Sequence, residues 1–393
     1  MDIPSIQAQL RADGLDGWLL FDFHGSNPIA SRLAGLAGSG KMTTRRWYYL
    51  IPATGEPEGL VHAIERHNLD ALPGAKRLYA GHRSLTEALR RLITGKRRLA
   101  MEYSPLGAIP YLSRVDAGTL ELVRSFGAEV VSSGDLAQQF EAVWDAPALA
   151  SHRAASERLY RIKDRAFQAV SERLAENRPT SEYEIQALMV GWFAEEGLVS
   201  DSAPVVAAAV NSADPHYLPT LTGCRTIARG DVVLLDLWGR LDEPGTVFAD
   251  ITWVGIAERE VPSSVRQVFE TIRDARDAAA TLVQTEIQAG NPVCGWQVDR
   301  AARRIIDSAG FGDRFVHRTG HSLGIDVHGN GVHMDDYETH DDRRLLPGTG
   351  FTIEPGIYLD AWGLRTEINM YVGDGDATIS GPTQTDVIPL LAS

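Results

Sequence analysis

Residues 1–145 alternate between two kinds of hydrophobic pattern. Short runs of aromatic and branched residues predict strands, and apolar residues at helical spacing predict helices between them. The predicted strands are 17–23, 45–52, 59–64 and 97–103, and the predicted helices are 84–94 and 117–127. This alternation predicts an α/β domain over residues 1–145 with a central sheet.

After residue 145 the predicted helices become longer. A helix is predicted over 147–177, since proline is tolerated in a first turn. Ser181 followed by Glu184 forms a capping-box pattern, which starts a second helix that ends at Gly197. Two further helices are predicted over 263–288 and 295–309, with strands around them. These elements predict a second domain over residues 146–393.

One segment of the second domain, 232–255, has two apolar arms joined by a turn at 240–245. Each arm contains one acidic residue, Asp236 in the first and Asp250 in the second. A buried ionised carboxylate is costly unless it is paired or holds a metal. An antiparallel hairpin brings these two acids to one place. From this segment alone, bonding of both carboxylates to backbone amides or to arginine stays an open alternative.

The segment 315–333 is rich in histidine and glycine. It holds four of the eleven histidines: His317, His321, His328 and His333. Its glycines argue against a helix, and the zinc-binding HExxH pattern is absent. Glycines beside His321 indicate a backbone that approaches other groups closely. A single histidine would more often be structural, but four in one segment favour chemistry.

The same segment also matches the G-x-S-x-G pattern of serine hydrolases, at 320–324 with Ser322 as the nucleophile. That pattern requires a following helix and then a downstream acid and histidine. Glycine- and asparagine-rich chain follows Ser322 instead, and too few residues remain for the rest of such a fold. A serine hydrolase is therefore a remote alternative.

Two more acids occur in strand-like runs near the end of the chain. Glu354 ends one apolar run, and Glu367 lies within the next, with Arg365 on the same face. A pairing of Arg365 with a glutamate is the simple alternative, and it is compatible with a neighbouring metal site.

The charges of these candidates suggest two cations. Four carboxylates and one neutral imidazole balance two divalent ions, whereas one ion would leave two negative charges in excess. An oxygen-rich set with one imidazole suits Mn²⁺ better than a structural zinc site. The predicted ligands are Asp236, Asp250, His321, Glu354 and Glu367.

The runs DLWG, FADITWVG, HRTGHSLGIDVHG, TIEPGIY and GLRTEI occur in this order. Together they resemble the methionine aminopeptidase–prolidase–creatinase family of metallopeptidases. The resemblance covers most of residues 150–393, and residues 1–145 resemble the family's N-terminal domain more loosely. It implies an α/β (α+β) chain with a creatinase-like N-terminal domain over 1–145 and a pita-bread catalytic domain over 146–393.

The resemblance also implies roles for individual residues. Asp236 would bind one ion, Asp250 and Glu367 would bridge both ions, and His321 and Glu354 would bind the other. The implied catalytic residues are Glu354, His317, His328 and His216, and the implied substrate-binding residues are His216, His317, His328 and Arg365. The sequence departs from the family at Gly329 and Ile368, where acids are usual, and in a slightly longer connection between the two aspartates. These departures leave the five ligand positions intact.

Family members with this layout cleave Xaa-Pro bonds. We therefore expect an exopeptidase that uses a hydroxide bridging two metal ions, most simply Mn²⁺, with Co²⁺ or Zn²⁺ as alternatives. The compact chain favours an Xaa-Pro dipeptidase (prolidase), with an Xaa-Pro aminopeptidase acting on longer peptides as the alternative. A non-catalytic pita-bread binding module is a remote alternative, because such relatives usually lose metal ligands and all five are present.

The composition restricts the classes of binding partner and the cellular compartment that we expect. A net charge of −14 argues against nucleic acid. Two cysteines, Cys224 and Cys294, cannot form a disulfide framework, which fits a reducing compartment. The N-terminus lacks a signal-peptide pattern, and no apolar run approaches the about 20 residues of a membrane helix. We expect a cytoplasmic homodimer without membrane partners that acts on short proline-containing peptides. The fragment 38–44 lacks the full phosphate-loop pattern.

Overall fold

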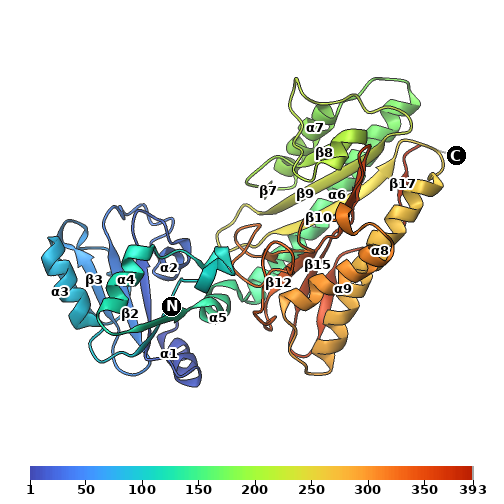
Figure 1. The fold of residues 1–393 in the computed structure, drawn as a ribbon. Helices are drawn as coiled ribbons and strands as arrows, with labels where there is room; N and C mark the ends of the chain where they lie inside the picture. Colours follow the sequence, from blue (N-terminus) through green and yellow to red (C-terminus); the bar gives the residue numbers. More distant parts are fainter. Residues whose placement is uncertain (392–393) are drawn as a thin grey trace. The chain divides into compact units, whose positions relative to one another are not determined.

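The computed structural model describes residues 1–391, and the chain divides into two compact units, Met1–Ala142 and Val143–Ser393 (Figure 1). Both units mix helices and strands, which confirms the predicted α/β class. Within residues 1–391, no helix is both long enough and apolar enough to cross a lipid bilayer.

The first unit is built on a six-stranded sheet in the order β4-β3-β2-β1-β5-β6. Its strands are β1 (Gly17–Asp22), β2 (Trp47–Pro52), β3 (Glu58–His62), β4 (Ala75–Tyr79), β5 (Arg98–Met101) and β6 (Glu129–Ser132). β1 and β3 pair antiparallel with β2, and the other neighbours are parallel. The four predicted strands are confirmed. β4 and β6 lie at the two edges of the sheet, and β4 is mostly exposed, so its hydrophobic pattern is weak.

Helices cover both faces of this sheet. They are α1 (Ile3–Ala12), α2 (Pro28–Leu33), α3 (His82–Leu92), α4 (Ala117–Ser125) and α5 (Gly134–Ala137). One core contains Leu89 of α3 and Val123 of α4, and the other contains Ile6 of α1 and Ala30 of α2. Alternating strand residues supply the two cores, as strand periodicity requires.

Up to residue 391, the second unit has four main helices and three sheets. The helices are α6 (Ala146–Ala175), α7 (Glu182–Glu195), α8 (Ser263–Gln288) and α9 (Gly295–Ser308). The strands are β7 (Leu198–Val199), β8 (Val205–Ala208), β9 (Val232–Leu241), β10 (Ala249–Ile256), β11 (Ser322–Leu323), β12 (Gly350–Ile353), β13 (Gly356–Tyr358), β14 (Gly363–Arg365), β15 (Ile368–Val372), β16 (Ala377–Ser380) and β17 (Ile388–Pro389). The predicted helices are confirmed, and so is the capping box: the Glu184 N–H donates to Ser181 Oγ at 3.2 Å, and the Ser181 N–H donates to Glu184 Oε2 at 2.8 Å.

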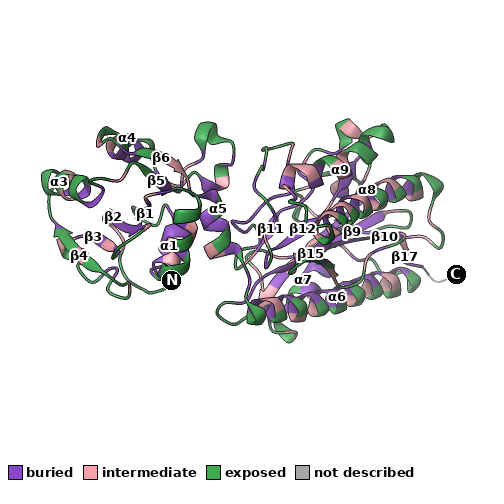
Figure 2. Ribbon diagram, turned by 90° about the horizontal axis from the view of Figure 1, so that it is seen from below, coloured by how far each residue is buried: buried purple, intermediate pink, exposed green. Residues whose placement is uncertain are grey.

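The long hairpin β9–β10 lies between two hydrophobic cores. β17, β10, β9 and β7 are neighbours in one sheet, with β8 also on β9, while β11-β12-β15-β16 and β13-β14 form the other sheets. Leu235 and Ile251 face α6 and α7, whereas Leu234 and Val254 face α8, α9 and the second sheet. In Figure 2 these strands are mostly buried, and the helices show exposed outer faces.

Two hydrogen bonds join β10 to the neighbourhood of β15. The Asp250 N–H donates to Asn369 Oδ1 at 3.0 Å, and the Glu367 N–H donates to the Thr252 carbonyl at 3.2 Å. These bonds place the acidic side chain of Asp250, on β10, beside that of Glu367, which lies in the connection between β14 and β15.

Candidate metal centre

The hairpin places its two aspartates on one face. Thr252 pairs with Asp236, and Asp250 pairs with Trp238, so the two acids are diagonal neighbours. Strand alternation turns Leu235 and the other odd-numbered residues of β9 towards α6. Both aspartates therefore face the side on which the second sheet lies.

His321 reaches the same place from a tight crossing of two chain segments. A Cβ on Gly320 would lie 2.0 Å from the Thr352 carbonyl oxygen, so only glycine permits this approach. The His321 N–H then donates to Thr352 Oγ1 at 3.0 Å. The close approach expected of the glycines around His321 is confirmed at Gly320.

The His321 ring is neutral and oriented. Its Nδ1–H donates to the Ser322 carbonyl at 3.2 Å, which leaves the Nε2 lone pair free to bind a cation. Nε2 lies 3.6 Å from Asp250 Oδ2 and 3.5 Å from Glu354 Oε1. Burial, with a contribution from His328, lowers the pKa of His321 well below its usual value.

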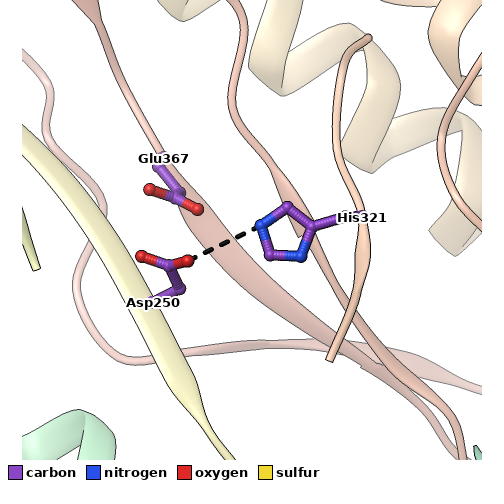
Figure 3. Close-up of side chains that lie close together, drawn as sticks. All are labelled: Asp250, His321 and Glu367. Carbon is purple, nitrogen blue, oxygen red and sulfur yellow. Dashed lines mark ion pairs between the residues drawn. The ribbon is translucent and has the colours of Figure 1, made fainter. Parts of the chain in front are cut away.

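Asp250, His321 and Glu367 form the centre of the site (Figure 3). Their ligand atoms all lie within 4.8 Å of one another, and each residue is at most 5% exposed. Burial, followed by the neighbouring carboxylates, raises the pKa values of Asp250 and Glu367 well above their usual range. Within residues 1–391, Asp250 Oδ1 and Glu367 Oε1 have no hydrogen-bond partner. Two buried, unpartnered carboxylate oxygens and an imidazole lone pair fit a divalent cation.

Glu354 and Asp236 lie at the border of this centre. Burial raises the pKa of Glu354 to about 7, with Arg365 and Arg318 opposing the shift. Burial also raises the pKa of Asp236, and its ion pair with Arg365 chiefly opposes this. The structure thus brings all five predicted ligands into one region, and Asp236 also has the arginine partner that the sequence left open.

Arg365 connects several of these residues. It is 6% exposed, and its Nε donates to Thr252 Oγ1 at 3.0 Å. Its Nη1 donates to the Tyr358 hydroxyl at 3.1 Å, and Nε lies 3.8 Å from Glu354 Oε2. Thr252 Oγ1 in turn donates to Glu367 Oε2 at 2.8 Å. Arg365 therefore fixes the positions of the candidate ligand side chains Asp236 and Glu354.

The three other predicted histidines differ in their surroundings. His317 uses both ring nitrogens within the protein, Nδ1 with the Arg318 carbonyl at 2.7 Å and Nε2 with the Tyr358 hydroxyl at 2.8 Å. The ring of His328 lies edge-on to that of His321, with 4.4 Å between centroids. His216 and His328 are exposed, and their ring nitrogens have no hydrogen-bond partner within the described residues. Although His328 as a residue is exposed, desolvation of its ring by the surrounding protein and the charge of Arg318 chiefly lower its pKa to about 4.

Two site residues were missed from the sequence. Tyr358 links His317 to Arg365, as described above. Trp238 shares the face of Asp236, and its Nε1–H donates to Asp201 Oδ1 at 2.6 Å. Strand periodicity from Asp236 was the signal that could have found Trp238.

Ser322 does not form a nucleophile elbow. It is 2% exposed within β11, and its hydroxyl oxygen accepts from the Gly331 N–H at 3.1 Å. The Ser322 N–H donates to His333 Nδ1 at 3.2 Å, and bends rather than a helix follow the strand. His333 is fully buried, away from solvent.

Comparisons with known proteins agree with this geometry. The model of metallopeptidase family M24 matches residues 154–374. A probable dipeptidase, PepE, of Mycobacterium tuberculosis is 31% identical over 230 residues, which is 58% of this chain and 56% of the relative. An Xaa-Pro dipeptidase of Lactobacillus delbrueckii subsp. lactis is 30% identical over 203 residues, 51% of this chain and 49% of the relative. The chain thus spans about half the length of these curated relatives.

The solved structure of dipeptidase PepE from Mycobacterium ulcerans has the same fold. The TM-score is 0.73 at 23% identity, and the alignment covers 99% of this chain and 97% of that chain. The predicted fold, an N-terminal α/β domain followed by a pita-bread domain, is confirmed, as is the resemblance carried by the motifs.

Proposed function

Because this chain belongs to metallopeptidase family M24, we propose that it is a divalent-metal-dependent exopeptidase that hydrolyses Xaa-Pro bonds. The observation that supports this best is the trio Asp250, His321 and Glu367, with two buried carboxylate oxygens that no group of residues 1–391 satisfies. Without a bound cation, such an arrangement of buried carboxylates destabilises the folded protein.

The proposed ligands are Asp236, Asp250, His321, Glu354 and Glu367, and two divalent ions would balance their charge. The oxygen-rich set favours Mn²⁺, with Co²⁺ or Zn²⁺ as alternatives. When bound, such ions supply a water of lowered pKa and polarise the scissile carbonyl. We also propose that the protein is a homodimer in solution, which a measurement of its molecular mass in solution tests.

Side chains around the ligands would handle protons and substrate. Glu354 Oε1 lies 3.5 Å from His321 Nε2, and this place beside the ligand trio suits a group that takes a proton from the attacking water and returns it to the leaving amine. His328 and His216 are solvent-exposed residues, which suits contact with the substrate carbonyl and the proline side of the bond. His317 would act by holding Tyr358, whose hydroxyl contacts Arg365.

Substrate choice rests on the resemblance and on the relative named an Xaa-Pro dipeptidase. A dipeptidase is our first choice. An Xaa-Pro aminopeptidase is the second candidate, because Leu218 and Leu221 beside His216 are exposed apolar side chains, 44% and 73%, that longer peptides could contact.

The test compares hydrolysis of an Xaa-Pro dipeptide and a longer Xaa-Pro peptide by chelated protein, with and without added Mn²⁺. We expect activity only with the metal and a higher kcat/KM on the dipeptide. A higher kcat/KM on the longer peptide selects the aminopeptidase. Activity that survives chelation, or no activity and no bound metal, refutes the proposal.

A further inference from the structure

The second unit contains another buried carboxylate, which lies outside the candidate metal centre. Glu182 is the first residue of α7 and is fully buried. Its oxygens accept hydrogen bonds from the N–H of Ala208 (2.6 Å), Asn211 Nδ2 (2.9 and 3.1 Å), the Tyr217 hydroxyl (2.6 Å) and the N–H of Arg225 (2.7 Å). All these donors lie in one segment, 208–225, hereafter the anchored segment.

The anchored segment carries His216 and has little regular structure of its own. Beyond the short 3₁₀ helix η5 (Ala209–Ala213) it contains turns and extended chain. Ala209 has a φ of 49°, a left-handed conformation that costs about 1 kcal/mol and persists only when the surroundings hold it. Glu182 binds the amide directly before this residue, so it holds the entry to the segment.

The segment is also packed against a site strand. The Gly363 N–H of β14 donates to Ser212 Oγ at 3.0 Å. A Cβ on Gly363 would lie 2.3 Å from the Ser212 carbonyl oxygen, so the two chains are in close contact. β14 ends at Arg365, the partner of Asp236. A shift of the anchored segment would therefore displace β14 beside the candidate metal ligands.

We propose that Glu182 is a positioning residue that sets the place of His216 in the substrate site through the anchored segment. The inference rests on the proposed function, since His216 matters only if it meets substrate. Next to His216, the Tyr217 hydroxyl donates directly to Glu182. Burial and then Glu182 raise the pKa of Tyr217, so this hydroxyl stays protonated and remains a donor.

The test uses Glu182→Gln, which keeps the size of the side chain but replaces one acceptor oxygen with an amide donor. Donors that the lost oxygen bound are left buried without an acceptor. Because His216 would bind ground state and transition state alike, we expect KM on an Xaa-Pro dipeptide to rise about tenfold with little change in kcat. Tyr217→Phe removes one donor only and should raise KM less, in the same direction.

A double-mutant cycle separates positioning from general damage. His216→Ala alone should raise KM, and adding Glu182→Gln should then change it little, because both changes act through one side chain. The matched control is Glu102→Gln in the first unit, where a fully buried carboxylate accepts from Trp18, Asn27 and Ser133. This control should leave KM unchanged.

Hydrogen–deuterium exchange of the anchored segment provides a readout besides activity. We expect faster exchange there in Glu182→Gln, with the metal centre still binding Mn²⁺. Unchanged KM with unchanged exchange overturns the proposal, and so do KM effects of Glu182→Gln and His216→Ala that multiply. A wild-type protein without Xaa-Pro activity refutes the proposed function and this role of His216, while the exchange data separately decide whether Glu182 anchors the segment.

Discussion

Removing one acid from the metal centre should stabilise the metal-free protein. Glu367 is 3% exposed, and among the residues that the structure describes only its Oε2 has a partner, the Thr252 hydroxyl at 2.8 Å. In Glu367→Gln the remaining oxygen can keep that bond, and the new amide faces Asp250, whose Oδ1 has no partner in the described chain. The substitution thus replaces a repulsion with a potential hydrogen bond.

The size of the effect follows from the geometry. Ligand atoms of Asp250 and Glu367 lie within 4.8 Å of each other. Two unit charges at that distance repel by about 3 kcal/mol at an effective dielectric constant of 20. The free energy of unfolding of the metal-free variant should therefore rise by about that amount when both acids are ionised.

The gain should depend on pH in a defined direction. Burial, then Glu354 and Asp236, raise the pKa of Glu367 in the folded protein well above 4.5. A group whose pKa is raised by folding contributes stability below its unfolded pKa, and this is lost as pH rises through the folded pKa. The wild type therefore loses stability towards alkaline pH, and the gain of Glu367→Gln should be small at pH 5 and largest at pH 9.

The assay is chemical denaturation of metal-free and Mn²⁺-loaded protein, followed by tryptophan fluorescence. We expect the variant to be more stable without metal and to gain little from Mn²⁺, whereas the wild type gains stability by binding. Glu182→Gln is the matched control: its carboxylate is fully satisfied, so it should lose stability with or without metal. A Glu367→Gln protein that is less stable than wild type in the metal-free state at every pH would refute the reasoning.

Three further predictions use other buried groups. Burial lowers the pKa of His152 from 6.5 to about 4, so the free energy of unfolding of the wild type should fall by about 2 kcal/mol between pH 7 and pH 5 because of this residue. In His152→Gln the free energy of unfolding should fall less on acidification. Equal losses in denaturation series of both proteins contradict this. Arg365→Met leaves Asp236 buried without its partner, which should lower the free energy of unfolding by about 3 kcal/mol in metal-free protein and by less after Mn²⁺ is added. An equal loss in both states shows that the ion pair and the metal site are independent. Ser322→Ala should retain chelator-sensitive peptidase activity within about threefold, because the lost hydroxyl only accepts from the Gly331 N–H; loss of activity with metal binding intact would revive the nucleophile hypothesis.

Local patterns in the sequence were enough for the longer helices and the central hairpin, whereas α1, α2 and α5 were not predicted. The helix predicted over 263–288 coincides with α8, and Ser181 with Glu184 marks the start of α7. These elements are long and periodic, so the hydrophobic pattern identifies them without tertiary information. Short or exposed strands such as β4, β7 and β17 have no such pattern, because their pairing partners rather than their own residues define them.

The ligand types could be predicted, but their partners could not. Acids in apolar strands and a glycine-flanked histidine can be recognised from the sequence, because burying such groups is costly unless they have a partner or a ligand. No local sequence pattern shows that Arg365 pairs with Asp236, 129 residues away, or that the Tyr358 hydroxyl forms a hydrogen bond with His317 Nε2. Such pairings depend on the register between β14 and the hairpin, which tertiary packing sets.

Burial alone does not separate a functional carboxylate from a structural one in this protein. Glu102, Glu182 and Glu367 are all almost completely buried. Neutral donors saturate the first two, so each forms a closed set of hydrogen bonds that needs no ligand. Glu367 and Asp250 instead each keep one oxygen to which no described residue donates, and both lie beside other acids. The deficit of donors, together with the repulsion, favours a bound cation, and it supports the candidate metal centre on physical grounds independent of any family resemblance.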